Sequence, residues 1–317
     1  MASIRITTED GSAPIDAKRQ RFTWYRIREG ATPYLLIAPL LILVAVFIYW
    51  PLFYSTYLSF FDWNFVRPDK DFVGWDNYTQ LWGDPRFMRA LNGTWIYFVT
   101  LIPIQVFLPL GLAMLLWPIR RAPGQHAYRV VLFSPTVVAW SVGAVMWLWI
   151  FNPLQGLLNK VLAEFGVERI NWLSDRDTAI WTVIVVATWK TLGFNLLLYL
   201  AALEAVPHDY VEAASLDGAG KWQIMRTIRF PLITPTFFFV LVTTVISVND
   251  DVFGAINVLT QGGPFESTTN IVYYLYEQGF KYFQIGDASA VSIIIFVATV
   301  MLTWLQFRFI EGRVHYG

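Results

Sequence analysis

Long apolar runs separated by shorter polar stretches are the dominant pattern of this chain. A helix needs about 20 mostly apolar residues to cross the hydrocarbon core of a bilayer. Six segments meet that length, and they lie near Tyr34–Phe60, Gly93–Trp117, Val130–Phe151, Ile180–Leu203, Leu232–Leu259 and Ala288–Phe309. The pattern therefore predicts an all-α polytopic membrane protein with about six transmembrane helices.

The composition agrees with this class and narrows the chemistry. Of the 317 residues, 56% are hydrophobic and only 15% are charged, against about 25% charged in soluble domains. The formal net charge is zero, so no basic field suggests a nucleic-acid partner. The chain has no cysteine, and its three histidines (His126, His208 and His315) are scattered. We therefore expect no metal site and no catalytic residues.

Lysine and arginine distribution predicts the orientation of the chain, because these residues concentrate in cytoplasmic connections. Fourteen lie in the N-terminal arm, the second–third and fourth–fifth connections and the C-terminal tail, against eight in the other connections. Both termini are thus expected in the cytoplasm, and the protein in the bacterial cytoplasmic (inner) membrane. The expected organisation is a cytoplasmic arm at 1–30, a membrane domain at 31–310 and a cytoplasmic tail at 311–317.

One polar connection, residues 204–235, predicts a helix–turn–helix at the cytoplasmic face. Pro207 suits a first helical turn, and Asp217-Gly218 is a turn signal. A second short helix should follow at 221–229, with Trp222, Met225 and Ile228 as a partial apolar stripe. On this pattern alone, an interfacial hairpin that binds no partner fits equally well.

The residues of this loop resemble a known family. The residues that carry the resemblance are Glu212, Ala213, Ala214, Asp217, Gly218, Ile228 and Pro231. Their order and spacing are similar to the EAA loop of binding-protein-dependent ABC importer permeases. Phe230 stands where the family usually has leucine. The stretches 33–39, 72–78 and 259–264 also resemble the first permease subunit of the maltose and glycerol-phosphate type.

The resemblance implies partners and a function. Glu212 would orient the loop, the two alanines would permit close docking on an ATPase, and Gly218 would form the turn. The implied partners are a second homologous permease subunit, two copies of an ATP-binding subunit, a periplasmic or lipid-anchored substrate-binding protein and membrane lipid. The chain has no Gly-rich loop ending in Gly-Lys-Ser/Thr, so ATP and magnesium are expected on the partner ATPase. The expected function is import of a sugar, oligosaccharide, polyol or sugar phosphate, by a transporter subunit that is no enzyme itself.

Polar residues inside the apolar segments are candidates for a substrate pathway, since they are costly in a membrane. The candidates are Lys190, Asn195, Asn249, Asp250, Asp251, Phe253 and Asn257. Amides and carboxylates can bind sugar hydroxyls, and Phe253 offers a ring for stacking. Other interpretations stay open: a salt bridge between Lys190 and one aspartate, a polar seam to the partner subunit, or an external vestibule around Asp250.

A glycine-rich stretch after the fifth segment, Gln261, Gly262, Gly263 and Pro264, predicts an external turn. We hypothesise that this turn faces the binding protein.

Three other functions remain as alternatives: an importer of the same family for a different solute, a stand-alone ion-coupled carrier, and a membrane enzyme. Ion-coupled carriers often have paired half-repeats with broken helices, a pattern that this sequence does not suggest. A membrane enzyme would need a convergent catalytic set. Only the importer requires the loop at 204–235.

Overall fold

The computed structural model describes residues 34–120 and 123–313. The expected arm at 1–30, Arg121 and the end of the tail lie outside the described residues. The chain divides into two compact units, residues 1–55 and 56–317, which are considered separately. In the first unit the chain is helical from Tyr34, and no residue of its most apolar window is buried.

A π-helical segment, η1 (Ala45–Tyr49), precedes α2 (Trp50–Leu58) in this first span. Pro51 lacks an N–H and its ring would clash with the carbonyl four residues earlier, so a regular α-helix is disfavoured here. The wider π turn accommodates the proline without ending the helix. The described part of the first predicted segment is thus one helix, from Tyr34 to Leu58.

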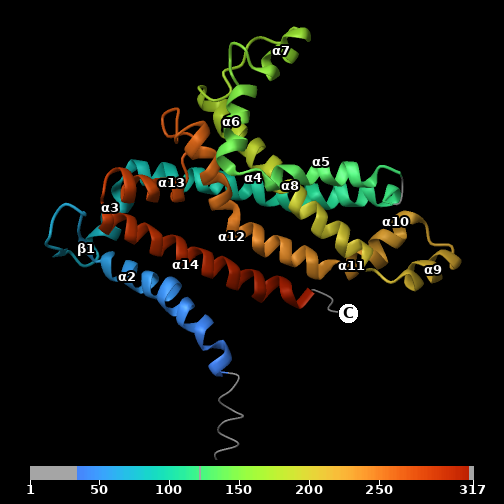
Figure 1. Ribbon diagram of the computed structural model, residues 1–317, viewed down its shortest axis with the longest axis horizontal. Helices are drawn as coiled ribbons and strands as arrows, with labels where there is room; N and C mark the ends of the chain where they lie inside the picture. The colour runs from blue at the N-terminus through green and yellow to red at the C-terminus, as the bar shows by residue number, and fades with distance from the viewer. Residues whose placement is uncertain (1–33, 121–122, 314–317) are drawn as a thin grey trace, which may run out of the picture. The chain divides into compact units, whose positions relative to one another are not determined.

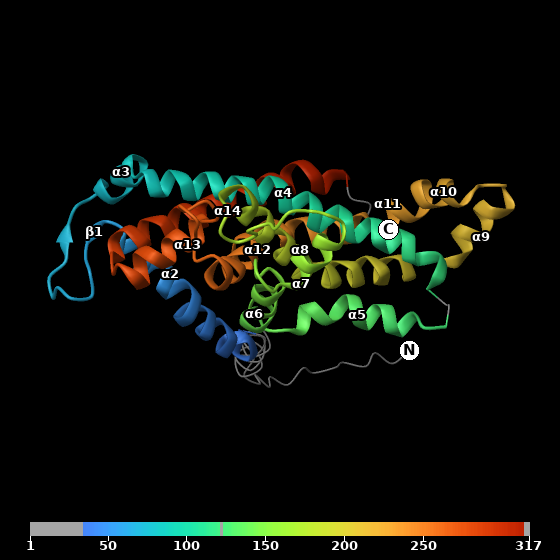
Figure 2. The same cartoon turned by 90° about the horizontal axis from the view of Figure 1, so that it is seen from above.

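Four long helices form the body of the second unit: α4 (Pro85–Leu116), α8 (Arg176–Glu204), α12 (Thr234–Leu259) and α14 (Ile285–Ile310). They run side by side in both views (Figures 1 and 2). Their buried faces are apolar, as with Tyr97 of α4, Val183 of α8 and Val252 of α12 in one core cluster. With the first span, five described helices are long and apolar enough to cross a membrane.

The third predicted segment is not one straight helix. It forms α5 (Gln125–Val137) and α6 (Trp140–Ile150), which meet at an angle of 104°. Val138 and Ala139 are extended, with ψ of 131° and 144°, so the backbone leaves the helix there. The prediction of a continuous span over Val130–Phe151 is therefore wrong, although the bent pair counted as one span gives the predicted total of six.

Short elements cap the long helices at two opposite ends (Figures 1 and 2). One end has the antiparallel strands β1 (Phe61–Asp62) and β2 (Asp71–Phe72), then α3 (Asp76–Gly83), α13 (Ile271–Tyr276) and η4 (Glu277–Lys281). The other end has α9 (His208–Leu216), α10 (Lys221–Ile224), η3 (Met225–Arg229) and α11 (Phe230–Leu232). The remaining short elements are η2 (Trp117–Ile119), α7 (Leu157–Glu164) and η5 (Glu311–Arg313).

Candidate functional sites: an exposed helix–turn–helix and a polar cavity

The predicted helix–turn–helix is present between α8 and α12. α9 ends at Leu216 and is capped by Asp217, and Gly218 adopts a left-handed φ of +83°. The turn closes with a hydrogen bond from the Ala219 amide to the carbonyl oxygen of Ala214, at 2.9 Å. An L-residue with a side chain rarely adopts this φ, so glycine is required by the turn itself.

α9 makes little use of its side chains for packing within the chain. None of its residues is buried, and Glu212 and Ala213 are exposed while Ala214 is half-buried. Leu216 has 84% of its surface exposed. A short helix that contributes nothing to the core presents its face for contact with something else.

The second half of the loop packs differently from its prediction. Ile224 and Met225 are buried, whereas Trp222 is 74% exposed, so not every member of the predicted stripe of Trp222, Met225 and Ile228 packs against the body of the protein. Ile228 and Pro231 are half-buried where the chain enters the body of the protein. The π-helical η3 just before Pro231 repeats the arrangement seen before Pro51.

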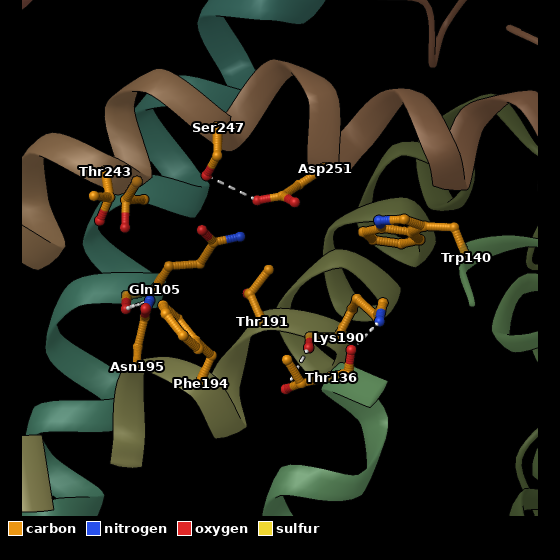
Figure 3. A pocket seen from close by; sticks show the side chains of 11 residues that line it. Gln105, Thr136, Trp140, Lys190, Thr191, Phe194, Asn195, Thr243, Ser247 and Asp251 are labelled. Atoms are coloured by element: carbon orange, nitrogen blue, oxygen red, sulfur yellow. Dashed lines mark hydrogen bonds between the residues drawn. The ribbon is translucent and has the colours of Figure 1, made fainter. Parts of the chain in front are cut away.

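A polar cavity of about 320 Å³ lies among α4, α5, α6, α8 and α12. It is lined by side chains with hydroxyl, amide, charged and aromatic groups, which Figure 3 shows around one common space. They are Gln105, Thr136, Trp140, Lys190, Thr191, Phe194, Asn195, Thr243, Thr244, Ser247 and Asp251. The cavity thus brings together three of the predicted pathway residues, Lys190, Asn195 and Asp251.

Lys190 is held by the break between α5 and α6. Its Nζ donates hydrogen bonds to the carbonyl oxygens of Pro135, Thr136 and Val138, at 3.0, 2.7 and 2.6 Å. An ammonium group has three donors, so these bonds use all of them. The same bonds supply partners to carbonyls that lose their helical donors where the helix breaks. The nearest groups to Lys190 Nζ are therefore backbone carbonyls, and no ion pair joins it to Asp250 or Asp251 among the described residues.

Gln105 and Asn195 form the wall between α4 and α8. The Asn195 amide donates to the carbonyl oxygen of Gln105 at 2.9 Å, in a buried position. The side chain of Gln105 is only 2% exposed, and its Nε2 has no hydrogen-bond partner. In Figure 3 this amide extends from α4 toward the Ser247–Asp251 face of α12. A buried amide without a partner costs free energy, about 1–3 kcal/mol, that a bound hydroxyl would recover.

Asp251 lies on the α12 face of the cavity. Ser247 donates a hydrogen bond of 3.1 Å to Asp251 Oδ2, one helical turn away. A carboxylate accepts several hydrogen bonds, so Asp251 retains capacity for hydroxyl donors of a ligand.

The other four predicted pathway residues do not line this cavity. The Phe253 ring packs against Tyr273 and Tyr276, with centroid distances of 6.2 and 5.4 Å. The Asn249 carbonyl oxygen accepts a bond from the Asn270 amide, while its Oδ1 is buried without a partner. Asp250 is exposed and Asn257 half-buried.

Sequence reasoning missed Gln105, Thr243, Thr244 and Ser247. Thr243, Ser247 and Asp251 are spaced four residues apart, and this repeat of polar side chains in an apolar helix was a usable signal. Gln105 gives a weaker signal, as a single amide in an apolar segment. Its position opposite α12 depends on packing that no local pattern encodes.

The glycine-rich turn is packed from within. Gln261 is exposed and Gly262 is buried, with the Tyr273 ring 3.0 Å from where a Cβ would lie. Thr268 donates to the Gly263 carbonyl oxygen at 2.8 Å, and the Gly263–Pro264 peptide is cis. The turn lies toward the end of the helices opposite α9 (Figure 1).

In the described ranges, no three His, Asp or Glu side chains gather to hold a metal ion.

Comparison with known proteins identifies the family. Residues 82–314 match the family described as binding-protein-dependent transport system inner membrane component. The sn-glycerol-3-phosphate transport system permease protein UgpA of Agrobacterium fabrum is 37% identical over 289 residues, covering 90% of this chain and 96% of that protein. UgpA of Escherichia coli O6:K15:H31 is 35% identical over 285 residues, covering 90% and 95%.

Solved structures agree with this fold. A bacterial ABC transporter involved in the import of the acidic polysaccharide alginate superposes with a TM-score of 0.78, covering 90% of this chain and 97% of that one, at 23% identity. A bacterial alginate ABC transporter in complex with an alginate pentasaccharide-bound periplasmic protein gives a TM-score of 0.79, covering 90% of this chain and 96% of that one, at 23% identity. This chain therefore belongs to the family of binding-protein-dependent transport inner membrane components. It is a permease subunit of that family, rather than an enzyme, and its apolar helices are those of a multi-pass inner-membrane protein.

Proposed function

We propose that this chain forms half of the translocation pathway of an ATP-driven importer for a hydroxyl-rich solute: a sugar, oligosaccharide, polyol or sugar phosphate. Its partners would be a second permease, two ATP-binding subunits that carry ATP and magnesium, and an external substrate-binding protein. Family membership supports the importer class, and the names of the relatives described above support a solute of this kind.

The observation that carries the coupling proposal is the exposed α9. A coupling element must be positioned firmly by its own chain while leaving one face free. The turn at Gly218 and the buried Ile224 and Met225 supply the first property, and the absence of any buried residue in α9 supplies the second. ATP-driven closure of the partner subunits would then move α9 as a rigid body and shift the long helices between two arrangements.

The proposed orientation places α9 in the cytoplasm. Lys221, Arg226 and Arg229 lie at this end of the helices, in agreement with the bias of basic residues toward cytoplasmic connections. α14 also ends there (Figure 1), which supports a cytoplasmic C-terminus. The glycine-rich turn at 261–264 would then face the binding protein.

The cavity at Gln105, Lys190 and Asp251 is the proposed solute site of this subunit. Its hydroxyl and amide groups stand on a wall that includes Trp140 and Phe194, a combination suited to a polyol, with polar edges and apolar ring faces. Asp250, Asn249, Phe253 and Asn257 stay candidates for the pathway on the outer side of the cavity or for the partner permease.

A phosphorylated solute is the second candidate within this function, favoured by the glycerol-phosphate permeases among the relatives. The single lysine of the cavity has all three donors engaged with carbonyl oxygens, and the Asp251 carboxylate would repel a phosphate. The cavity chemistry therefore favours a solute that is uncharged where it contacts this subunit.

The test is purification from native membranes in mild detergent, followed by uptake in proteoliposomes. Co-purification of a second permease and an ATPase, with ATP-dependent uptake of a sugar or polyol, is the expected result. Recovery of this chain alone from a monodisperse, folded sample would contradict the importer proposal. Uptake of glycerol 3-phosphate but of no neutral polyol would keep the importer and overturn the preference for an uncharged solute.

A further inference from the structure

Three arginines lie near the α9 end of the long helices, and too few acidic side chains surround them to balance their positive charge. They are Arg120 after η2, Arg129 in α5 and Arg229 in η3, and the Nε atom of each is buried without a hydrogen-bond partner. An unpaired buried donor on a charged group is more costly than a neutral one. The arrangement therefore calls for an anion that the described residues do not supply.

Arg120 and Arg229 share one aromatic ring. The guanidinium carbons lie 4.0 and 5.2 Å from the centre of the Trp117 ring. Cation–π contact stabilises each arginine, but two like charges around one indole repel each other. Burial, and then the positive charge of Arg120, lower the pKa of Arg229, which expresses the same repulsion.

The carboxylate of Glu204 offsets the positive charge of these arginines only in part. Glu204 lies 3.6 Å from Arg120 Nε, beyond good hydrogen-bonding distance, and its side chain is 59% exposed. An exposed pair of this kind contributes little. Arg229 has no ion pair among the described residues.

An apolar groove of about 830 Å³ opens beside the two arginines. Lys221 adds a third cation to it, and Leu115 and Trp222 form an apolar wall with 72% and 74% of their surfaces exposed. The groove lies where the apolar span Pro85–Ile119 ends, the level at which lipid headgroups begin.

We infer that this groove, between the inner end of α4 and the α9–η3 loop, binds an anionic phospholipid. Its phosphate lies against Arg120 and Arg229, and an acyl chain covers Leu115 and Trp222. Charge complementarity selects an anionic headgroup, and the adjoining apolar wall selects a lipid over a free anion. The site is separate from the solute cavity and does not depend on which solute is carried.

Bound lipid would brace the coupling loop. Arg229 lies in η3 and Arg120 follows α4, so one phosphate contacting both links the loop to a long helix. We therefore expect the stability of the loop, and with it the coupling of ATP hydrolysis to transport, to depend on anionic lipid.

The experiment uses the complete transporter in nanodiscs and brominated lipids, which quench tryptophan on contact. The Trp222 signal is isolated as the difference between the wild type and Trp222→Phe. It should be quenched more strongly by brominated phosphatidylglycerol than by brominated phosphatidylcholine, with an affinity ratio of roughly 10- to 30-fold for two arginines. Equal quenching by the two lipids in the wild type would overturn the proposal without any arginine variant.

Arginine variants then test which side chains cause the preference for phosphatidylglycerol over phosphatidylcholine. Arg120→Gln/Arg229→Gln should abolish it, and Arg120→Lys/Arg229→Lys, which keeps the charge, should retain most of it. Arg226→Gln is the matched control, because Arg226 is an exposed arginine of the same segment that does not line the groove. A preference that survives in the double glutamine variant, or is lost in Arg226→Gln, would contradict the site.

Inorganic phosphate distinguishes a lipid from a free anion. The preference for phosphatidylglycerol should persist when about 20 mM phosphate is added at constant ionic strength. This concentration is high enough for a weakly bound free anion to compete with the lipid. If phosphate removes the preference and raises the unfolding temperature in phosphatidylcholine nanodiscs, the site binds a free anion and the lipid assignment is wrong.

Discussion

Two polar connections of α12 share turn-forming residue types but differ in how they pack. In the connection before α12, the first half is exposed: α9 buries no residue, and the space around Gly218 is open. The connection after α12 is anchored by buried residues, with Thr268 and Asn270 fully enclosed and Gly262 against the Tyr273 ring. Glycine, proline and hydroxyl residues mark both as turns, but only the tertiary partners decide which is a free surface and which is a structural joint.

The partners of the buried turn come from α4. The Tyr97 hydroxyl donates to the Thr268 carbonyl oxygen at 2.9 Å, and the Thr94 hydroxyl accepts from the Ile271 amide at 2.8 Å. Gly93 has the Thr269 carbonyl oxygen directly where a Cβ would be. The exposed loop has no comparable neighbour along α9. The difference teaches that a rigid turn can position the pathway, whereas an unpacked one can transmit a partner's motion.

The largest expected effect is at Gly218. Gly218→Val places a β-branched residue at a φ of +83°, a strain of about 1–3 kcal/mol that the open surroundings do not offset. The turn should reorganise, so that transport falls to background while the protein remains in the membrane. Uptake, ATPase co-purification and membrane content are the measurements.

Gly220→Val is the matched control for that variant. Gly220 has a φ of −72° and equally open surroundings, so valine fits there. Normal transport by Gly218→Val would refute the coupling role, and equal loss in both variants would show a general intolerance of bulk in the loop.

The second effect concerns the buried turn. In Gly93→Ala the new methyl group would overlap the Thr269 carbonyl oxygen, so α4 and the turn must separate. We expect a loss of about 1–3 kcal/mol in stability, measured as a lower unfolding temperature of the detergent-purified transporter.

Gly111→Ala provides the comparison within the same helix. No atom lies within 4 Å of its added Cβ, and alanine favours helix over glycine by up to about 1 kcal/mol. Its unfolding temperature should be unchanged or higher. Equal destabilisation by both substitutions would contradict the proposed close contact of α4 with the turn.

Sequence periodicity was sufficient for the main helices, because crossing a bilayer requires a length and polarity that local composition records. The third segment shows the limit. The apolar pattern predicted one continuous span there, but the carbonyl oxygens at the break accept hydrogen bonds from Lys190, which lies 52 residues after Val138. A hydrogen bond over that separation has no local signature.

The candidate sites divide in the same way. The EAA-like pattern located the exposed loop because the turn chemistry is local, with Asp217-Gly218 and Pro231 at its boundaries. The pathway residues were predicted only from the free-energy cost of polar side chains in a membrane. That criterion finds Lys190 and Asp251, but it does not tell which space each side chain faces. Asn249 and Phe253, which are one helical turn apart, contact Asn270 and the tyrosines of α13 and do not line the cavity.

The third effect tests the hydroxyl network of the buried turn. Thr268→Val removes the bonds to the Gly263 carbonyl oxygen and to the Thr260 hydroxyl, at 2.8 and 2.7 Å. The half-buried Gly263 carbonyl oxygen loses this donor, whereas the Thr260 hydroxyl keeps its 3.4 Å bond to the Ile256 carbonyl oxygen. We expect about 1–2 kcal/mol of destabilisation. Thr227→Val in the exposed loop removes only a bond within its own helical segment, to Gln223, and should change stability by less than about 0.5 kcal/mol. Similar effects at both positions would remove the contrast between the turns.

The smallest effect is electrostatic and lies at the same end as the buried turn. Lys281 Nζ donates to the Tyr273 hydroxyl at 2.8 Å and pairs with Glu277 at 3.2 Å. The hydrogen bond to Tyr273, and then the one to Glu277, raise the pKa of Lys281 above its ordinary value. A raised pKa in the folded state means that the charged form is stabilised by folding. That contribution is fully present below the pKa of the unfolded chain, about 10.4, and is lost as the pH rises through the folded-state pKa.

Since 38% of the side chain is exposed, Lys281→Met should lower stability at pH 8 by less than about 1 kcal/mol. The difference from the wild type should narrow as the pH rises above about 10.4 and through the folded-state pKa, because the wild type then loses the same interaction. Unfolding temperatures of both proteins across this range provide the measurement, and a constant difference would show that the lysine contributes by packing of its methylene chain and not by its charge.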